Sequence, residues 1–150
     1  MKLLNADFVT SAAHADGIPR DEVARIALAG RSNVGKSSLI NALCRQKTRL
    51  LNFYRITMEG GPGGPGRWPV YLVDLPGYGY ARGGDASVEE LAEIAREYYE
   101  DNDRRAQHQG VASATLLLVD SRHPGLKADV AAGGWLSRLA LLGLWLVPFV

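Results

Sequence analysis

This sequence of 150 residues has a single cysteine, nearly balanced charge and no long uninterrupted apolar run. With Cys44 alone, an internal disulfide framework is excluded and a reducing compartment is favoured. The formal net charge of +1 gives no general argument for binding nucleic acid or a membrane surface. Residues 1–17 contain one lysine and no sustained apolar stretch, so we expect no signal peptide. The length indicates one domain with a substantial core.

The most apolar stretch is WLSRLALLGLWLVPFV, residues 135–150, which is interrupted by Arg138 and Pro148. It is also shorter than the about 18–20 apolar residues that a membrane-spanning helix needs. We therefore expect a core helix that runs into a buried strand, and no association with a membrane.

Strand-like and helix-like segments alternate along the chain, which indicates an α/β domain with a mainly parallel sheet. The expected strands are residues 25–30, 50–59, 67–74, 114–120 and 144–150. The expected helices are residues 34–45, 87–107 and 126–141. A capping box formed by Ser87 and Glu90 is expected to begin the second helix. The tract GGPGGPG, residues 60–66, is expected to be an exposed connection.

Residues 30–37, Gly-Arg-Ser-Asn-Val-Gly-Lys-Ser, match the phosphate-loop pattern G-x-x-x-x-G-K-[ST] between a strand and a helix. Gly30 and Gly35 let the backbone curl so that its N–H groups point at phosphate oxygens. Lys36 is expected to neutralise charge on the β- and γ-phosphates, and the Ser37 hydroxyl to bind Mg²⁺. The positive end of the following helix adds to this attraction. We therefore predict a nucleotide phosphate site here.

Such a site needs an acidic residue at the end of a neighbouring strand to hold hydrated Mg²⁺. Asp74 in YLVDLPG and Asp120 in LLLVDSRHPG are the two candidates. Asp74 begins D-x-x-G, in which Gly77 can offer its N–H to a γ-phosphate and move when that phosphate leaves. Asp120 has no glycine at the matching offset. We therefore assign the water-mediated metal contact to Asp74 and expect Asp120 only to end a core strand.

Together these motifs resemble the EngB (YihA/YsxC) family of small bacterial GTPases. The segments that carry the resemblance are ADFVTSA (6–12), AGRSNVGKSSLINAL (29–43), TRLLNFYRI (48–56), LVDLPGYGYA (72–81) and LLLVDSRHPGLKADVAAGGWL (116–136). The resemblance implies a three-layer P-loop NTPase fold of the Ras-like type, with a mainly parallel sheet that contains one antiparallel strand. It implies one G domain over residues 1–150.

The resemblance also implies a slow GTPase that binds GTP and GDP and assists assembly of the large ribosomal subunit, contacting the subunit or its rRNA. It implies a link to cell division and septation, a cytoplasmic or organelle-matrix location, and a monomer when complete. The implied GTP-binding residues are Gly30, Arg31, Ser32, Asn33, Val34, Gly35, Lys36, Ser37, Ser38, Lys47, Thr48, Asp74, Leu75, Pro76 and Gly77. The implied Mg²⁺ contacts are Ser37, Thr48 and, through water, Asp74.

The chain departs from the family pattern at two places. Between ALCRQ and KTRLLNF the family carries a longer segment, so the tether of Thr48, which matches the first switch threonine, is short. The base-reading motif Thr-Lys-x-Asp follows the strand that begins near Leu144 in the family, and no residue of this sequence matches it. We therefore expect a domain without its last strand and helix, which binds guanine nucleotides weakly and discriminates poorly against ATP.

Catalytic roles are less defined than the phosphate site. Tyr78 follows Gly77, where Ras-type proteins have a glutamine that orients the attacking water, so slow turnover is expected. Lys36 would also stabilise charge in the transition state. Related GTPases use an asparagine at the position of Asn33 to bind K⁺. For Asn33 two interpretations stay open, a K⁺ ligand or a residue that only shapes the loop.

Other polar residues are expected to have structural or solvated roles. His14 and His108 are expected at the surface, and His123 is expected to fix a turn rather than bind a metal. Four basic residues surround the first switch, and they form either a solvated edge or a contact with rRNA phosphate. They are Arg45, Lys47, Arg49 and Arg55.

Three function classes remain open from the residues. The first is a GTPase switch in ribosome assembly, which DLPGYGYA favours. The second is an ATP-using P-loop enzyme such as a small-molecule kinase, which would need an acceptor-binding lid with clustered arginines and would not need D-x-x-G. The third is a degenerate or truncated fragment with weak nucleotide binding, which the apolar residues 144–150 favour. A comparison of GTP and ATP affinities distinguishes the first two classes.

Overall fold

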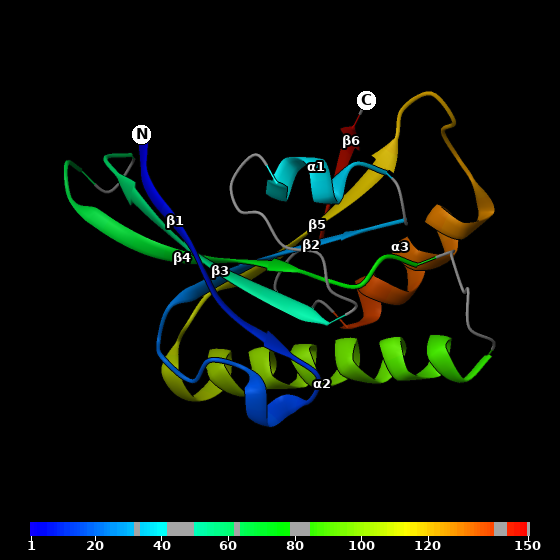
Figure 1. The fold of residues 1–150 in the computed structure, drawn as a ribbon, viewed down its shortest axis with the longest axis horizontal. Coiled ribbons are helices and arrows are strands. Elements are labelled where there is room, and N and C mark those ends of the chain that lie inside the picture. Colours follow the sequence, from blue (N-terminus) through cyan, green and yellow to red (C-terminus); the bar gives the residue numbers. More distant parts are fainter. Residues whose placement is uncertain (32–33, 42–49, 62–63, 79–84, 140–143, 150) are drawn as a thin grey trace.

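The computed structural model describes residues 1–31, 34–41, 50–61, 64–78, 85–139 and 144–149. The described residues form one six-stranded sheet with helices on both faces (Figure 1). In chain order the elements are β1 (Lys2–Ala12), a 3₁₀ turn (Ala15–Gly17), β2 (Ala24–Gly30), α1 (Lys36–Asn41), β3 (Leu51–Glu59), β4 (Arg67–Asp74), α2 (Asp85–Gln109), β5 (Ser113–Asp120), α3 (Lys127–Leu139) and β6 (Leu144–Phe149).

The strand order across the sheet is β1-β3-β4-β2-β5-β6. β4, β2, β5 and β6 are mutually parallel, and β3 pairs antiparallel with both β4 and β1. Among the described strands only β3 therefore runs against the others, which confirms the expected sheet. Parallel strands bring their carboxyl ends to one edge, and this places the ends of β2, β4 and β5 together.

The N-terminal strand β1 was not expected. It pairs with β3 over almost its whole length, from Lys2 opposite Glu59 to Ala12 opposite Leu51. Two register shifts interrupt this pairing, between Leu3 and Asn5 and between Phe8 and Thr10. Such bulges break the period-2 alternation of apolar residues that would identify a strand in the sequence.

Two helix starts differ from the sequence-based expectation. α1 begins at Lys36 rather than at residue 34, because Gly35 has φ of 110° and cannot continue a right-handed helix. α2 begins at Asp85, so Ser87 lies inside the helix and the expected capping box does not mark its start. The expected continuation of α1 through residues 42–45 lies outside the described residues. The other expected strands and helices lie within a few residues of those observed.

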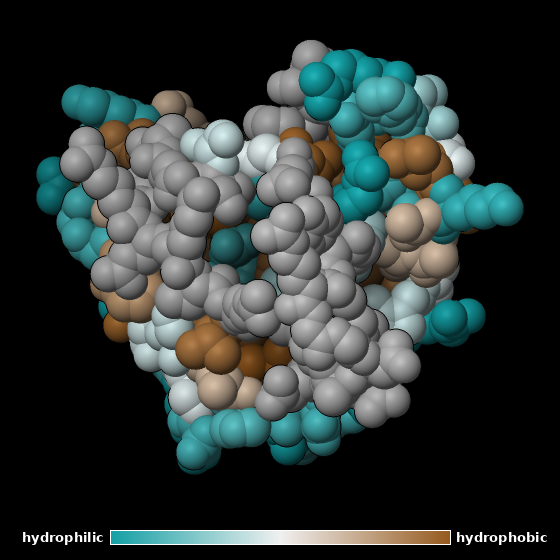
Figure 2. Space-filling model, turned by 45° about the vertical axis from the view of Figure 1, so that its right-hand side comes forward, coloured by the Kyte–Doolittle hydropathy of each residue, from teal (hydrophilic) through white to brown (hydrophobic). Residues whose placement is uncertain are grey.

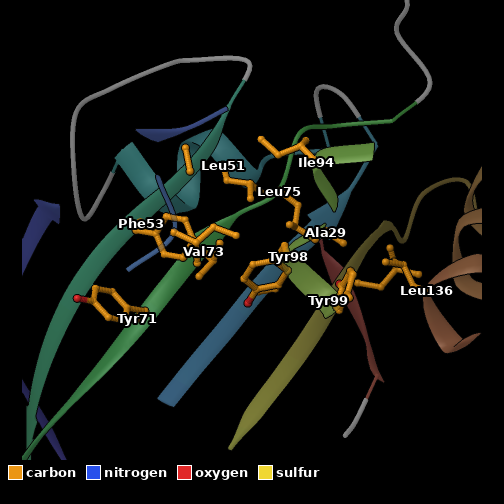
Figure 3. Packing of buried hydrophobic residues seen from close by; sticks show 14 of the residues in the cluster. Ala29, Leu51, Phe53, Tyr71, Val73, Leu75, Ile94, Tyr98, Tyr99 and Leu136 are labelled. Carbon is orange, nitrogen blue, oxygen red and sulfur yellow. The ribbon is translucent and has the colours of Figure 1, made fainter. Parts of the chain in front are cut away.

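The apolar side chains form a core on each face of the sheet. Between the sheet and helices α2 and α3, Phe53, Tyr98, Leu117 and Leu136 are almost completely buried. Figure 3 shows Tyr98 and Tyr99 of α2 lying against the strands. On the opposite face, Ile40 of α1 packs with side chains of β2, β3, β4 and β5. α1 and α2 thus cover opposite faces of the sheet, as the three-layer arrangement requires (Figure 1).

A buried cation joins α2 to the end of β2 that lies away from the phosphate loop. The Arg25 side chain is fully buried and donates to Asp101 at 2.6 Å, to Asn102 at 2.8 Å and to the Pro19 carbonyl. Arg105 donates to the carbonyls of Asp21 and Val23, at 2.6 and 2.8 Å. The two arginines therefore fix the segment before β2 against α2.

The surface of the described residues is mixed in character. On the face in Figure 2, both hydrophobic and hydrophilic residues are exposed. In the part of the chain that the structure describes, every helix is too short or too polar to cross a membrane.

Candidate phosphate-binding site

The candidate site lies where β2, β4 and β5 end, at Gly30, Asp74 and Asp120. β2 lies between the other two strands, with Leu28 opposite Asp74 on one side and Gly30 opposite Leu118 on the other. The chain leaves β2 and enters the phosphate loop at this edge. In open α/β sheets, ligands bind at the carboxyl ends of strands. The three residues that the sequence singled out are thus brought together.

The two glycines of the loop serve different purposes. Gly35 has a positive φ of 110°, a conformation that residues with a side chain rarely adopt. Gly30 is required by close packing, because an added Cβ would lie 2.9 Å from Val34 Cγ1 and 3.0 Å from the Leu118 carbonyl oxygen. The first glycine therefore lets the loop lie against β5, and only the second provides the expected unusual backbone conformation.

Lys36, the first residue of α1, folds back into the loop. Its ammonium donates to the Gly30 carbonyl at 2.7 Å and lies 3.4 Å from the Arg31 carbonyl oxygen. The residue is only 7% exposed. Burial lowers the pKa of Lys36, and the nearby Asp74 carboxylate opposes this shift. The Lys36 ammonium is thus held inside the loop, where it would balance the negative charge of a bound phosphate group.

The Asp74 carboxyl group lies within electrostatic range of Lys36. Burial raises the pKa of Asp74 to about 6, against the opposing effects of Lys36 and of a hydrogen bond from Asn52. Among the described residues, its buried Oδ1 oxygen has no hydrogen-bond partner. A buried carboxylate oxygen without a donor is costly unless a ligand or water satisfies it. Oδ1 therefore fits a water of hydrated Mg²⁺, which donates two hydrogen bonds.

Asp120 is engaged in a different way. Its two oxygens accept hydrogen bonds from the Arg122 guanidinium, both at 2.9 Å, and Oδ1 also accepts from the Arg122 backbone N–H at 3.0 Å. His123 Nδ1 lies 3.4 Å from Oδ2, and its backbone N–H closes a turn onto the Asp120 carbonyl. The bonds from Arg122 hold the pKa of Asp120 far below its usual range. Of the two carboxylates, Asp74 is the one that keeps an oxygen for a ligand.

Asp74→Asn should stabilise the nucleotide-free and metal-free chain at pH 7.5. Because the folded pKa is raised from 3.8 to about 6, the folded state holds this proton more tightly than the unfolded state. Its contribution to stability is therefore greatest below pH 4 and is lost as the pH rises through 6. Asparagine removes this cost, so the free energy of unfolding should rise by about 1–3 kcal/mol at pH 7.5 and change little at pH 4.

Chemical denaturation at the two pH values measures this effect. Asp120→Asn is the matched control with the opposite expected sign, because the ionised form of Asp120 is stabilised by Arg122 in the fold. A loss of stability at pH 7.5 in the Asp74 variant would contradict our inference that burial destabilises the ionised Asp74 carboxylate in the folded state.

The residues after Asp74 run beside the loop. Leu75 donates its backbone N–H to the Leu28 carbonyl at 3.0 Å, and its side chain is buried in the core. Tyr78 forms a parallel bridge with Arg31, the second residue of the loop. The Leu75 side chain therefore belongs to the core rather than to the ligand side, and the bridge at Tyr78 brings the end of this segment beside the loop.

The structure describes only some of the other expected site residues. Val34, Gly35 and Ser38 lie at the turn into α1, where Ser38 donates its N–H to the Gly35 carbonyl at 3.0 Å. Ser37 belongs to α1, and its side chain is not described. The remaining expected residues lie outside the described residues, as do three of the four basic residues. They are Ser32, Asn33, Lys47, Thr48, Arg45 and Arg49.

Two further polar contacts near this edge had no signal in the sequence. Tyr78 Oη donates to Asp129 Oδ1 at 2.8 Å, which joins the D-x-x-G segment to α3. Asn52 of β3 is buried beside Asp74 and donates a hydrogen bond to it. Both pairs join residues that are distant in the chain, so only the tertiary structure reveals them. No group of three or more His, Cys, Asp or Glu side chains that could hold a metal occurs among the described residues.

This chain is similar to known proteins in sequence and in fold. A family model described as "50S ribosome-binding GTPase" matches residues 25–140. Two solved structures of Era share the fold, each with a TM-score of 0.52. One is a variant of Aquifex aeolicus Era bound to GDP and AlF₄⁻, with 18% identity over 83% of this chain and 39% of that chain. The other is Era with MgGDPNP and nucleotides 1506–1542 of 16S ribosomal RNA, with 19% identity over 84% and 40%.

Curated relatives are more similar in sequence. The "Probable GTP-binding protein EngB" of Heliobacterium modesticaldum is 39% identical, over 94% of this chain and 66% of the relative. The protein of that name from Chlorobaculum tepidum is 38% identical over 87% and 65%, and the one from Lactobacillus helveticus is 38% identical over 94% and 69%. The chain thus spans about two thirds of the length of these relatives. On this sequence similarity and the matched GTPase domain, the chain belongs to the EngB family.

Proposed function

We propose that this protein binds GTP, hydrolyses it slowly and acts as a switch on the large ribosomal subunit during its assembly. The observation that carries the proposal is that Lys36 and Asp74 lie within electrostatic range of each other at one edge of the sheet, beside a loop with the phosphate-loop pattern. The matched ribosome-binding GTPase domain and the names of the relatives support the choice of GTP and of the ribosome.

In this proposal the loop backbone and Lys36 hold the β- and γ-phosphates. Ser37 and Asp74 would hold Mg²⁺, Asp74 through water at its unpartnered Oδ1. Mg²⁺ held by these residues would supply positive charge to neutralise the negative charge that develops during phosphate transfer. Binding of Mg²⁺ by Thr48 remains a prediction from the resemblance, as do a monomeric state, a cytoplasmic location and a link to cell division. For Asn33 the two interpretations, a K⁺ ligand or a residue that only shapes the loop, both stay open.

The environment of Tyr78 supports the proposal of slow turnover. Its hydroxyl donates to Asp129, and burial, followed by that carboxylate, raises the pKa of Tyr78. The phenol is therefore a neutral donor that is already engaged, and it cannot serve as a general base near neutral pH. A residue that orients the attacking water has to come from elsewhere, which includes a partner.

Tyr78→Phe should accordingly leave the rate of GTP hydrolysis unchanged within about twofold. The variant should lose about 1–2 kcal/mol of stability, because the buried Asp129 loses a hydrogen-bond donor. Single-turnover hydrolysis and thermal unfolding measure the two effects. A fall in rate of tenfold or more with little loss of stability would make the phenol a participant in the reaction.

Co-sedimentation with large ribosomal subunits tests the function. We expect the chain to pellet with the subunits in the presence of a non-hydrolysable GTP analogue and Mg²⁺, and much less with GDP. Lys36→Ala serves as the control that cannot hold the phosphates, and it should remain in the supernatant with either nucleotide. Association that is independent of the nucleotide would contradict a switch. Phosphate transfer from ATP to a small acceptor, faster than GTP hydrolysis, would favour a P-loop kinase instead.

A further inference from the structure

Three neighbouring strands, β1, β3 and β4, each place a polar residue at the same level of the sheet, and the last of these residues is Asp74. Ser11 of β1 is opposite Asn52 of β3, and Asn52 is opposite Asp74 of β4. Asn52 is 1% exposed, and its neighbours Leu51 and Phe53 are completely buried. An amide in such a place is costly unless its polar atoms are hydrogen-bonded, so its contacts need an explanation.

The hydrogen bonds fix the orientation of the Asn52 amide. The Ser11 hydroxyl donates to Asn52 Oδ1 at 2.6 Å, and Asn52 donates to the Asp74 carboxylate. A carboxylate only accepts hydrogen bonds, so the NH₂ group has to face Asp74 and the amide oxygen has to face Ser11. Ser11 therefore favours the one amide orientation that can hold Asp74.

The same contact leaves one oxygen of Asp74 for a ligand. Because Oδ1 of Asp74 has no partner among the described residues, we assign the hydrogen bond from Asn52 to the other oxygen, Oδ2. Anchoring Oδ2 restricts rotation of the carboxylate and keeps Oδ1 in one place. Outer partners of this kind orient the groups that contact a metal in many proteins.

We propose that Asn52, oriented by Ser11, is a positioning residue that holds Asp74 so that its Oδ1 receives the hydrated Mg²⁺ of a bound nucleotide. This inference rests on the proposed nucleotide site and adds two residues to it that lie outside the phosphate loop and D-x-x-G. The competing interpretation is that the chain of hydrogen bonds only fastens the edge strand β1 to the sheet.

Asn52→Leu separates these interpretations, because leucine has a similar size and no donor. The affinity for GDP is measured by calorimetry with excess Mg²⁺ and again with EDTA. The affinity with Mg²⁺ divided by the affinity with EDTA, here called the Mg²⁺ ratio, gives the factor by which the metal strengthens GDP binding. We expect the ratio to fall by about 10-fold or more, in line with the loss seen for outer partners of metal sites. The affinity in EDTA should stay within about twofold, because the phosphate loop is untouched.

Thr115→Val is the matched control. Thr115 is another buried polar residue of the sheet, it contacts the Tyr99 hydroxyl at 3.0 Å, and it lies on β5 rather than beside Asp74. Its replacement should leave the Mg²⁺ ratio unchanged. An unchanged ratio in Asn52→Leu, or an equal fall in both variants, would overturn the proposal.

Ser11→Ala keeps the test decisive if Asn52→Leu does not fold. This variant leaves Asn52 in place and removes only the donor that orients it, so the ratio should fall by about threefold. A ratio equal to that of the unchanged protein would then overturn the proposal. If the proposed nucleotide site itself is wrong, the unchanged protein will not bind GDP or will bind it equally well with and without Mg²⁺. This result differs from failure of the inference about Asn52, which would be seen only in the variants.

Discussion

Replacement of Lys36 by alanine should abolish measurable nucleotide binding and leave the fold intact. The ammonium is held 2.7 Å from the Gly30 carbonyl oxygen, inside the loop, where it would meet the β- and γ-phosphates. Charge-assisted hydrogen bonds contribute about 1.5–3 kcal/mol each, so the loss of two would weaken binding by roughly 100-fold or more. Calorimetric titration of a non-hydrolysable GTP analogue, which carries both phosphates, in the presence of Mg²⁺ measures this loss.

The fold should tolerate the change because Lys36 belongs to neither core cluster. Burial lowers the pKa of Lys36, which means that the folded state pays to keep the ammonium charged. Lys127→Ala is the matched control, because Lys127 is the first residue of α3 and is exposed. Equal affinity for the GTP analogue in the Lys36 variant and the unchanged chain would show that this loop is not the site.

Replacement of Arg25 by methionine should cost about 3–5 kcal/mol of stability, the range found when one partner of a buried ion pair is removed. The guanidinium reaches Asp101 at 2.6 Å and Asn102 at 2.8 Å, and it also lies over the rings of Phe53 and Tyr98, 5.8 and 5.9 Å from their centroids. Methionine fills much of this volume but leaves the acceptors without a donor. Denaturant unfolding measures the change.

Arg104→Met is a matched control on the same acceptor. Arg104 lies 3.8 Å from Asp101, but its side chain is 65% exposed, whereas that of Arg25 is fully buried. Exposed ion pairs contribute about 0–1 kcal/mol, so the control should change stability little. Similar losses in the two variants would mean that the buried network does not carry the stability we assign to it.

The sequence predicted the elements whose signal is local. The apolar run of β5 and the strand ending in Asp74 are recognisable from consecutive residues, and their bounds differ from the observed ones by at most one residue. β1 was missed because its bulges disturb the alternation and its polar residues resemble a loop. The start of α1 shifted because the φ of Gly35 is decided by the shape of the loop.

The candidate site also contains residues that the sequence predicts and residues that only the tertiary structure identifies. The phosphate loop and D-x-x-G are contiguous in sequence, so Lys36 and Asp74 could be named before their meeting was seen. The partners of Asp74 and Tyr78 could not, because Asn52 and Asp129 reach them only through strand pairing and helix packing. Arg25 was placed correctly in a buried strand, but an arginine inside a core has meaning only once Asp101 and Asn102 are found beside it.

Comparison of GDP, GMP and guanosine as ligands in the presence of Mg²⁺ tests the central claim, that Lys36, Asp74 and the loop form a site for nucleotide phosphates. In the proposed site the loop and Lys36 would hold the β-phosphate, which GMP lacks, so calorimetry should show GDP binding at least about 100-fold more tightly than GMP. Guanosine should show no measurable binding. Guanosine bound as tightly as GDP would mean that the phosphates contribute nothing at this edge of the sheet, and it would contradict the account.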